Sequence, residues 1–176
     1  MSRLRSEHLG ADHAVEGFVS GKAALDDWLR RSARHAEAAN TGRTFVWVEP
    51  GSTNVVAYFT LAAHLVRREA VPRSIGHGSP SAIPAILLAR LALDRSLQGQ
   101  GLGGQLLLDA LQRAGEASSR AAARLVVVDA IDGSAAEFYL RFGFRPCPAP
   151  HRLVRKTSEI IAALRHEDWN LQPPPT

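Results

Sequence analysis

The first half of the chain carries one helical and two extended hydrophobic patterns. Between residues 22 and 39, apolar side chains recur every three to four positions, which is typical of an amphipathic helix. These side chains are Leu25, Trp28, Leu29, Ala33 and Ala36. Runs rich in β-branched and aromatic residues follow at 44–48 and 55–61, on either side of a turn-forming segment at 50–54, and predict a β-hairpin. Residues 63–83, with several arginines, glycines and prolines, are predicted to be a loop.

The second half of the chain predicts strands and helices in alternation. Residues 86–93 are nearly all apolar, as in a central strand, and a glycine cluster at 99–104 then opens a helix with one apolar side. A short buried strand at 125–128 and a helix at 135–142, which Gly143 ends, come next. A strand around Val154 and a helix at 158–164 complete the pattern. This order predicts an α/β or α+β domain built around a mixed sheet.

Composition limits the class of protein. At 176 residues, with 45% hydrophobic and 22% charged residues, the chain has room for one globular domain, which we place at residues 1–170, before a Pro-rich tail at 171–176. The single cysteine, Cys147, excludes an internal disulfide framework, and the seven histidines show no metal-ligand spacing, so we expect no metal site. No apolar stretch is long enough for a membrane span and no secretory signal is visible, so we expect a cytoplasmic protein without a membrane partner.

The net charge permits a polyanionic partner without requiring one. The chain carries 21 lysines and arginines against 17 acidic residues, a formal charge of +4. All of these cations are arginines except Lys22 and Lys156. Arginine suits bidentate phosphate contacts, although a codon bias toward arginine would give the same composition.

The segment from residue 86 to 104 is the most informative part of the sequence. A strand runs into a glycine-rich turn and the turn into a helix, which exposes backbone N–H groups at the positive end of the helix dipole and so predicts an anion site. A tight turn without a ligand is the alternative. Gly99, Gly101 and Gly104 also satisfy the dinucleotide pattern, but too few residues follow for the second half of a dinucleotide fold. No Gly-Lys-Ser/Thr follows, which excludes a P-loop.

A second segment indicates which kind of phosphate-bearing ligand the glycine loop binds. Residues 129–144 read as a strand end, a short helix with Ala-x-x-Phe-Tyr, and Phe-Gly-Phe before another strand. Together with Gln98-x-x-Gly101-x-Gly103, this segment resembles the GNAT acetyltransferases. The resemblance implies the GNAT fold, a mixed and mostly antiparallel central sheet flanked by helices in a single domain. It also implies that acetyl-coenzyme A is the cosubstrate and that the helical tyrosine, Tyr139, lies beside its sulfur.

The resemblance assigns roles to particular residues. It implies that the cofactor is held by the loop and by the neighbouring strand and helix, at Leu91, Leu93, Gln98, Gly99, Gly101, Leu102, Gly103, Gly104 and Phe138. Tyr139 is the candidate catalytic residue, a general acid that protonates the departing thiolate. An α-amino group, with a pKa of roughly 7.7–8.0, is already partly neutral near pH 7, so a dedicated base is dispensable for such a substrate.

The segments 18–29, 42–46 and 88–93 resemble more narrowly the TacT-type acetyltransferase toxins of toxin–antitoxin pairs. That resemblance implies acetylation of the amino group of aminoacyl-tRNA, a block of translation, a ribbon-helix-helix antitoxin as partner and a possible homodimer. Arg30, Arg31 and Arg34 share one predicted helix face, and Arg90 interrupts an apolar strand, so these four are the candidate tRNA contacts. The alternatives are an acetyltransferase of a protein or small-molecule amine, and a non-catalytic module that binds coenzyme A.

Overall fold

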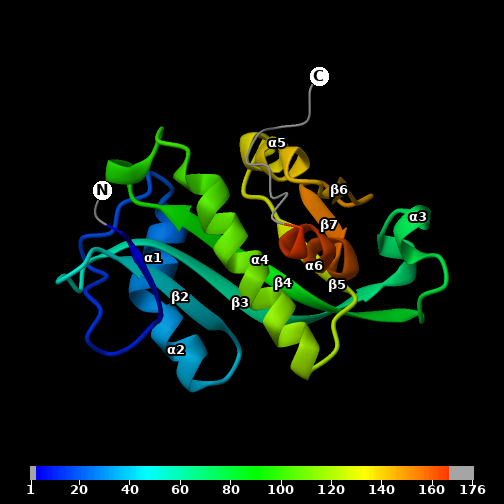
Figure 1. Ribbon diagram of the computed structural model, residues 1–176, viewed down its shortest axis with the longest axis horizontal. Coiled ribbons are helices and arrows are strands. Elements are labelled where there is room, and N and C mark those ends of the chain that lie inside the picture. The colour runs from blue at the N-terminus through cyan, green and yellow to red at the C-terminus, as the bar shows by residue number, and fades with distance from the viewer. Residues whose placement is uncertain (1–2, 167–176) are drawn as a thin grey trace. The chain divides into compact units, whose positions relative to one another are not determined.

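Within residues 3–166, which the computed structural model describes, seven strands form one sheet in the order β1-β2-β3-β4-β5-β7-β6 (Figure 1). The pairs β1–β2, β2–β3, β5–β7 and β6–β7 run antiparallel, and β4–β5 runs parallel. The predicted α+β fold with a mixed sheet is therefore confirmed. The domain boundary at residue 170 and the tail at 171–176 lie outside the described residues.

The described chain divides into two compact units. The first comprises residues 3–62 and 89–110, and the second comprises residues 63–88 and 111–166. Strands β3 (Val55–Arg67) and β4 (Ala82–Leu93) and helix α4 (Leu102–Arg120) each run from one unit into the other.

In addition to parts of those three elements, each unit has elements of its own. The first unit contains β1 (Arg5–His8), α1 (Ala23–Arg31), α2 (Ala33–Ala38), β2 (Arg43–Val48) and the short 3-10 helix η2 (Arg95–Leu97). The second unit contains η1 (Arg68–Ala70), α3 (Arg73–Gly76), β5 (Leu125–Asp129), α5 (Gly133–Arg141), β6 (Arg145–Pro146), β7 (Arg152–Lys156) and α6 (Thr157–Arg165).

The core of the first unit has helices on both faces of its strands. Val46 and Val48 of β2 are buried in one cluster with Leu29 of α1, as the hydrophobic stripe of that helix predicts. Because side chains alternate along a strand, Trp47 points to the opposite face, where its indole N–H donates to the Asp109 carboxylate of α4 at 2.8 Å. The strands of this unit are thus fixed between α1 and the first half of α4.

The core of the second unit is built on the parallel pair. Residues 85–88 of β4 pair with residues 125–128 of β5, and these short apolar runs are buried except for the partly buried Leu87, as is typical of a parallel pair covered on both faces. Leu125 and Val127 pack in one cluster with Val154 of β7 and Val66 of β3. Backbone pairing and apolar burial therefore hold β5 in a central position, and its carboxyl end leads directly to α5.

Two sequence predictions need correction, and one strand was not predicted. The helix predicted over residues 22–39 is two helices, α1 and α2, separated by a turn at Ser32, whose φ of −119° departs from the regular helical value. The loop predicted over 63–83 is wrong at both ends: β3 continues to Arg67 with Val66 buried, and β4 already begins at Ala82. Strand β1 was not predicted; it is only four residues long and has no apolar alternation.

Candidate active site

The glycine loop adopts a conformation that opens space at its surface. Gly99 and Gly101 have φ values of +76° and +74°, in the left-handed region that favours glycine. A Cβ atom built at either position would meet no atom within 4 Å. These glycines are therefore required for the backbone conformation and not for close packing, and the space beside them is free for a ligand. This is the cradle that a phosphate group of a cofactor needs.

The loop leads directly into the N-terminus of a long helix. Leu102, Gly103 and Gly104 form the first turn of the 19-residue helix α4. The first four N–H groups of an α-helix have no partner inside the helix, and the helix dipole places partial positive charge there. The predicted anion site thus has its backbone donors in place, and the residues present fit a pyrophosphate.

Gln98 acts on the loop itself. Its side-chain amide donates to the carbonyl oxygen of Ser20 at 2.7 Å and to that of Leu93 at 3.0 Å. The first contact joins the loop to a segment 78 residues earlier in the chain. Gln98 therefore positions the backbone on which the anion site depends, a role that the motif alone does not reveal.

Asp94 is a second support of the loop. Its carboxylate accepts hydrogen bonds from the N–H of Val19 at 2.9 Å and from the N–H and hydroxyl of Ser96 at 3.0 and 2.8 Å. Partial burial raises the pKa of Asp94, but these hydrogen bonds outweigh burial and hold the pKa below its ordinary value. An acidic residue directly after an apolar strand was the only signal for this role in the sequence.

The segment that receives these contacts is itself fixed by a buried carboxylate. Asp26 of α1 accepts from the backbone N–H of Ser20 at 2.9 Å and from its hydroxyl at 2.6 Å. The backbone N–H of Arg95 donates to the Val19 carbonyl at 2.8 Å. Helix α1, the segment around Ser20 and the glycine loop thus form one hydrogen-bonded assembly within the first unit.

Leu91 and Leu93 lie at the end of β4 that leads into the loop. Both are half-buried, whereas Ala92 between them is buried in the core with α1. The two leucines therefore share the other face of the strand. Their backbone contact with a cofactor stays a prediction from the family resemblance.

Tyr139 lies on α5, whose two ends are firmly defined. The carboxylate of Asp132 accepts from the N–H of Ala135 at 2.8 Å and caps the first turn. At the other end Gly143 adopts φ +84°, as predicted, and the N–H of Phe144 donates to the carbonyl of Tyr139 at 3.3 Å. Both ends of the short helix are thereby satisfied, so the position of the tyrosine is fixed.

The surroundings of Tyr139 keep its hydroxyl protonated. The residue is 7% exposed, and its ring makes T-shaped contacts with Phe138 at 5.2 Å and Phe144 at 5.6 Å. Burial raises the pKa of the Tyr139 hydroxyl well above its ordinary value. Within the described part of the chain this hydroxyl has no hydrogen-bond partner. It is therefore a proton donor that is not engaged elsewhere.

The candidate tRNA arginines differ from one another in their contacts. Arg30 donates to the Phe18 carbonyl at 2.5 Å, and Arg34 donates to the carbonyls of His13 and Gly10, so both guanidinium groups hold the N-terminal segment in place. Arg31 is exposed and has no polar partner among residues 3–166. Of the three on this helix pair, Arg31 is thus the one available to a phosphate without loss of an internal contact.

Arg90 is accommodated in its apolar strand by an aromatic stack. Its guanidinium lies 5.1 Å from the ring centroid of Trp28, a cation–π geometry, and donates to the Ala89 carbonyl at 2.8 Å. Trp28 in turn stacks on Tyr58 with 6.2 Å between centroids, and the Tyr58 hydroxyl donates to the Leu25 carbonyl. The side chain is held in a defined position, and it is only half-buried.

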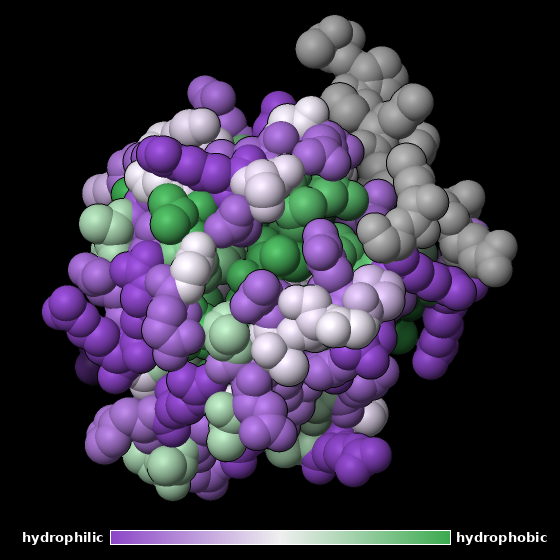
Figure 2. All heavy atoms as spheres, turned by 90° about the vertical axis from the view of Figure 1, so that its left-hand side faces the viewer, coloured by the Kyte–Doolittle hydropathy of each residue, from purple (hydrophilic) through white to green (hydrophobic). Residues whose placement is uncertain are grey.

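The structure distributes the predicted residues over its two units. The loop residues, the end of β4 and the four arginines belong to the first unit, and Phe138 and Tyr139 belong to the second. Figure 2 shows apolar side chains gathered in the middle of one face among hydrophilic ones. No helix among residues 3–166 has the length and apolarity of a membrane span, and no group of metal-ligating side chains occurs in that range.

The first unit thus carries backbone donors at the head of α4 that fit an anion, and the second carries a protonated tyrosine hydroxyl. Residues 63–146 match the acetyltransferase (GNAT) domain. The chain is also 37% identical, over 76% of its length and 80% of the relative's, to a tRNA-acetylating toxin of Mycobacterium tuberculosis. The chain belongs to the GNAT acetyltransferase family.

Solved structures agree with this assignment. AtaT in complex with acetyl-methionyl-tRNA superposes with a TM-score of 0.84 at 29% identity, over 92% of this chain and 99% of that one. A tyrosine-to-phenylalanine variant of KacT gives 0.85 at 25% identity, over 90% and 98%. A further structure, of AtaT with its antitoxin AtaR and acetyl-CoA, gives 0.79 at 26% identity, over 92% and 98%. The predicted GNAT fold is confirmed.

Proposed function

We propose that this chain is an acetyl-coenzyme A-dependent N-acetyltransferase toxin that acetylates the amino group of aminoacyl-tRNA and so blocks translation. The observation that carries the proposal is the 37% identity, over three quarters of the chain, to a tRNA-acetylating toxin. The relative AtaT was solved with acetyl-methionyl-tRNA, and its structures with acetyl-CoA support the choice of acyl donor.

The first unit supplies the groups that hold the cofactor. The left-handed conformations of Gly99 and Gly101 and the first turn of α4 at Leu102, Gly103 and Gly104 would bind its pyrophosphate through backbone N–H groups. Gln98 keeps the loop in position, and Leu91 and Leu93 would line the approach along β4. When bound, acetyl-coenzyme A supplies an acetyl group activated as a thioester.

Tyr139 is the proposed catalytic residue, a general acid. Acyl transfer to an amine needs a neutral amine and a proton for the departing thiolate, and the raised pKa of the Tyr139 hydroxyl keeps its proton available at neutral pH. Such proton transfer typically contributes roughly 10²–10⁴-fold to the rate. Phe138 packs against the tyrosine ring and is the second candidate cofactor contact on α5.

The partners follow from the same proposal. Arg30, Arg31, Arg34 and Arg90 would contact tRNA phosphates, with Arg31 the only one of the helix trio whose guanidinium has no internal partner in the described chain. A ribbon-helix-helix antitoxin would neutralise the enzyme, in line with the AtaT–AtaR complexes. We also propose that the protein forms a homodimer and is located in the cytoplasm.

The test uses the purified chain, acetyl-coenzyme A and a pool of charged tRNA, followed by digestion and mass spectrometry. We expect N-acetyl-aminoacyl-adenosine from one or a few amino acids. Tyr139→Phe should lose about 10²–10⁴-fold in kcat with cofactor affinity unchanged. The chain has only two tyrosines, so Tyr58→Phe, which removes the other hydroxyl and its hydrogen bond to Leu25 but keeps the ring that stacks on Trp28, is the control: it should lower the melting temperature without the roughly 10²–10⁴-fold loss in kcat. Acetylation of proteins or polyamines in place of tRNA would refute the substrate and keep the enzyme class.

A further inference from the structure

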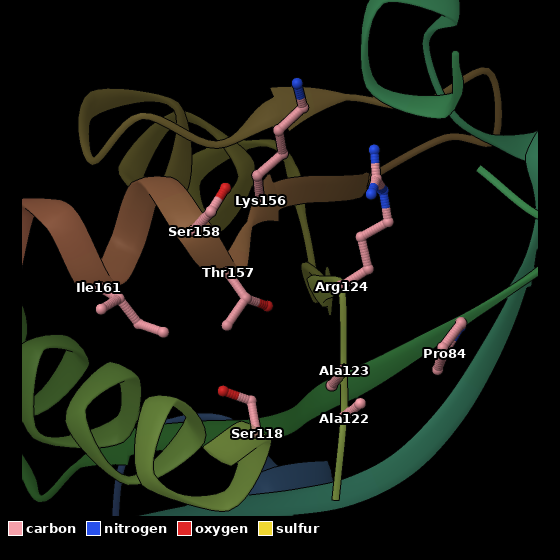
Figure 3. Close-up of a pocket in the computed structure, with 9 residues that line it drawn as sticks. All are labelled: Pro84, Ser118, Ala122, Ala123, Arg124, Lys156, Thr157, Ser158 and Ile161. Carbon is pink, nitrogen blue, oxygen red and sulfur yellow. The ribbon is translucent and has the colours of Figure 1, made fainter. Parts of the chain in front are cut away.

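A pocket of about 470 Å³ lies in the second unit, where α4 ends and α6 begins. Figure 3 shows the nine residues that line it. They are Pro84, Ser118, Ala122, Ala123, Arg124, Lys156, Thr157, Ser158 and Ile161. This volume is within the range of small-molecule sites, roughly 300–1,000 Å³. None of these residues belongs to the glycine loop or to α5.

The charge of the lining has one sign. Arg124 and Lys156 are its only charged residues, and within residues 3–166 neither has an ion-pair or hydrogen-bond partner for its side chain. Both side chains extend on the same side of the pocket (Figure 3). The nearest acidic residue along α6, Glu159, forms an ion pair with Arg145 at 3.7 Å and does not line the pocket. Two uncompensated cations at one pocket favour an anionic ligand.

Hydrogen-bond donors converge on the same place. The pocket lies at the N-terminus of α6, a nine-residue helix whose first turn has no side-chain cap. Thr157, the first residue of that helix, is only 4% exposed, and its hydroxyl has no hydrogen-bond partner. Figure 3 shows this hydroxyl pointing toward the space between α6 and the segment at Ala122 and Ala123. A buried hydroxyl without a partner is costly, so its presence at this point favours a bound acceptor.

The rest of the wall is apolar. Pro84, Ala122, Ala123 and Ile161 form it. A bare phosphate ion would use the cations and hydroxyls and leave this wall uncovered, whereas a nucleotide would cover it with its sugar or base. We propose that this pocket is a second binding site, distinct from the glycine loop, for the phosphate of a nucleotide. That phosphate belongs either to a free mononucleotide or to a nucleotide within the tRNA; only the second source depends on the proposed function.

The direct test is calorimetric titration of the full chain with adenosine monophosphate, adenosine and inorganic phosphate. We expect adenosine monophosphate to bind, inorganic phosphate to bind more weakly, and adenosine more weakly than the monophosphate by about tenfold or more. Arg124→Ala and Lys156→Ala should each weaken binding by about tenfold, since a charge-assisted hydrogen bond is lost. Arg165→Ala removes an exposed cation at the other end of α6 and is the matched control, with no change expected.

Thr157→Val separates binding from folding. Valine has nearly the shape of threonine and lacks the unpartnered hydroxyl, so the free protein should melt at the same temperature or higher while binding weakens. A lower melting temperature would mean that the hydroxyl stabilises the free protein, which would refute its assignment to a ligand.

A second measurement distinguishes the two sources of the phosphate. If the phosphate belongs to tRNA, Arg124→Ala should raise KM for charged tRNA severalfold at unchanged kcat, and Arg165→Ala should not. If it belongs to a free nucleotide, adenosine monophosphate binding should depend on Arg124 while KM for tRNA stays constant. The proposal is overturned if neither nucleotide binding nor KM distinguishes Arg124→Ala from Arg165→Ala. The binding titration needs no catalysis, so it stays decisive even if tRNA is not the substrate.

Discussion

Substitution of Gly101 by alanine tests whether the left-handed loop conformation serves the cofactor. Gly101 has φ +74°, and a Cβ atom there would meet nothing within 4 Å, so the substitution adds backbone strain without a steric clash. Gly51, in the turn between β2 and β3, has φ +76° and the same open space around it. The pair Gly101→Ala and Gly51→Ala therefore applies similar strain at the proposed cofactor site and at a turn outside it.

The size of both effects follows from this strain. A non-glycine residue in the left-handed region costs roughly 1–2 kcal/mol. For a chain of this length, 1 kcal/mol lowers the melting temperature by roughly 2–4 °C, so a variant that keeps the strained conformation should melt about 2–8 °C lower. If the free loop of Gly101→Ala instead relieves the strain by leaving the left-handed conformation, cofactor binding must restore that conformation. The same 1–2 kcal/mol then appears as a rise of roughly 5–30-fold in Kd.

The assay is thermal unfolding of both variants, followed by titration with acetyl-coenzyme A. We expect Gly51→Ala to lose melting temperature at unchanged Kd, and Gly101→Ala to raise Kd to the extent that its free loop relieves the strain, with a correspondingly smaller loss in melting temperature. Equal Kd values for the two variants would refute the role of the loop conformation in binding. Gly101→Ala with neither a lower melting temperature nor a higher Kd would refute the left-handed conformation itself.

Three further predictions concern the supports of the site. Gln98→Ala removes both side-chain hydrogen bonds that hold the loop. In an assay of coenzyme A release, it should raise KM for acetyl-coenzyme A severalfold with kcat little changed. A selective loss of kcat would contradict a positioning role. Because the folded pKa of Asp94 is lowered, its contribution to stability is present above the unfolded value of about 3.9 and is lost as pH falls through the lower folded pKa. Melting curves between pH 2 and 6 should therefore be less pH-dependent for Asp94→Asn, and identical slopes would contradict this. Arg31→Ala should weaken tRNA binding and reduce its salt dependence by about one phosphate contact, without a change in melting temperature. Arg30→Ala should weaken binding and also lower the melting temperature. Filter binding at several salt concentrations and thermal unfolding distinguish the two variants.

Local patterns were sufficient for much of the fold. In the apolar stripe of α1, Leu29 is buried and the partly buried Leu25 and Trp28 pack against the same cluster, because helical periodicity determines which side chains share a face. Asp94 and Asp132 follow strands and cap a turn and a helix, a role for which aspartate is suited by its short carboxylate side chain. The longer course of β3 was missed, because its end alternates exposed and buried residues among charged side chains, and strand pairing overrides that weak local signal.

The sequence by itself determined the local features of the proposed site: a glycine loop at the head of a helix, a tyrosine between Phe138 and Phe142-Gly143-Phe144, and the alternation of strands and helices of an α+β fold. Glycine spacing and helix capping are local properties, so they can be read from neighbouring residues. Only the tertiary structure decided which side chains support that chemistry. The contact of Gln98 with Ser20 joins residues 78 positions apart, and the pocket between α4 and α6 brings Arg124 and Lys156 together from different segments. Such contacts depend on how strands pair and helices pack, and no local pattern specifies them.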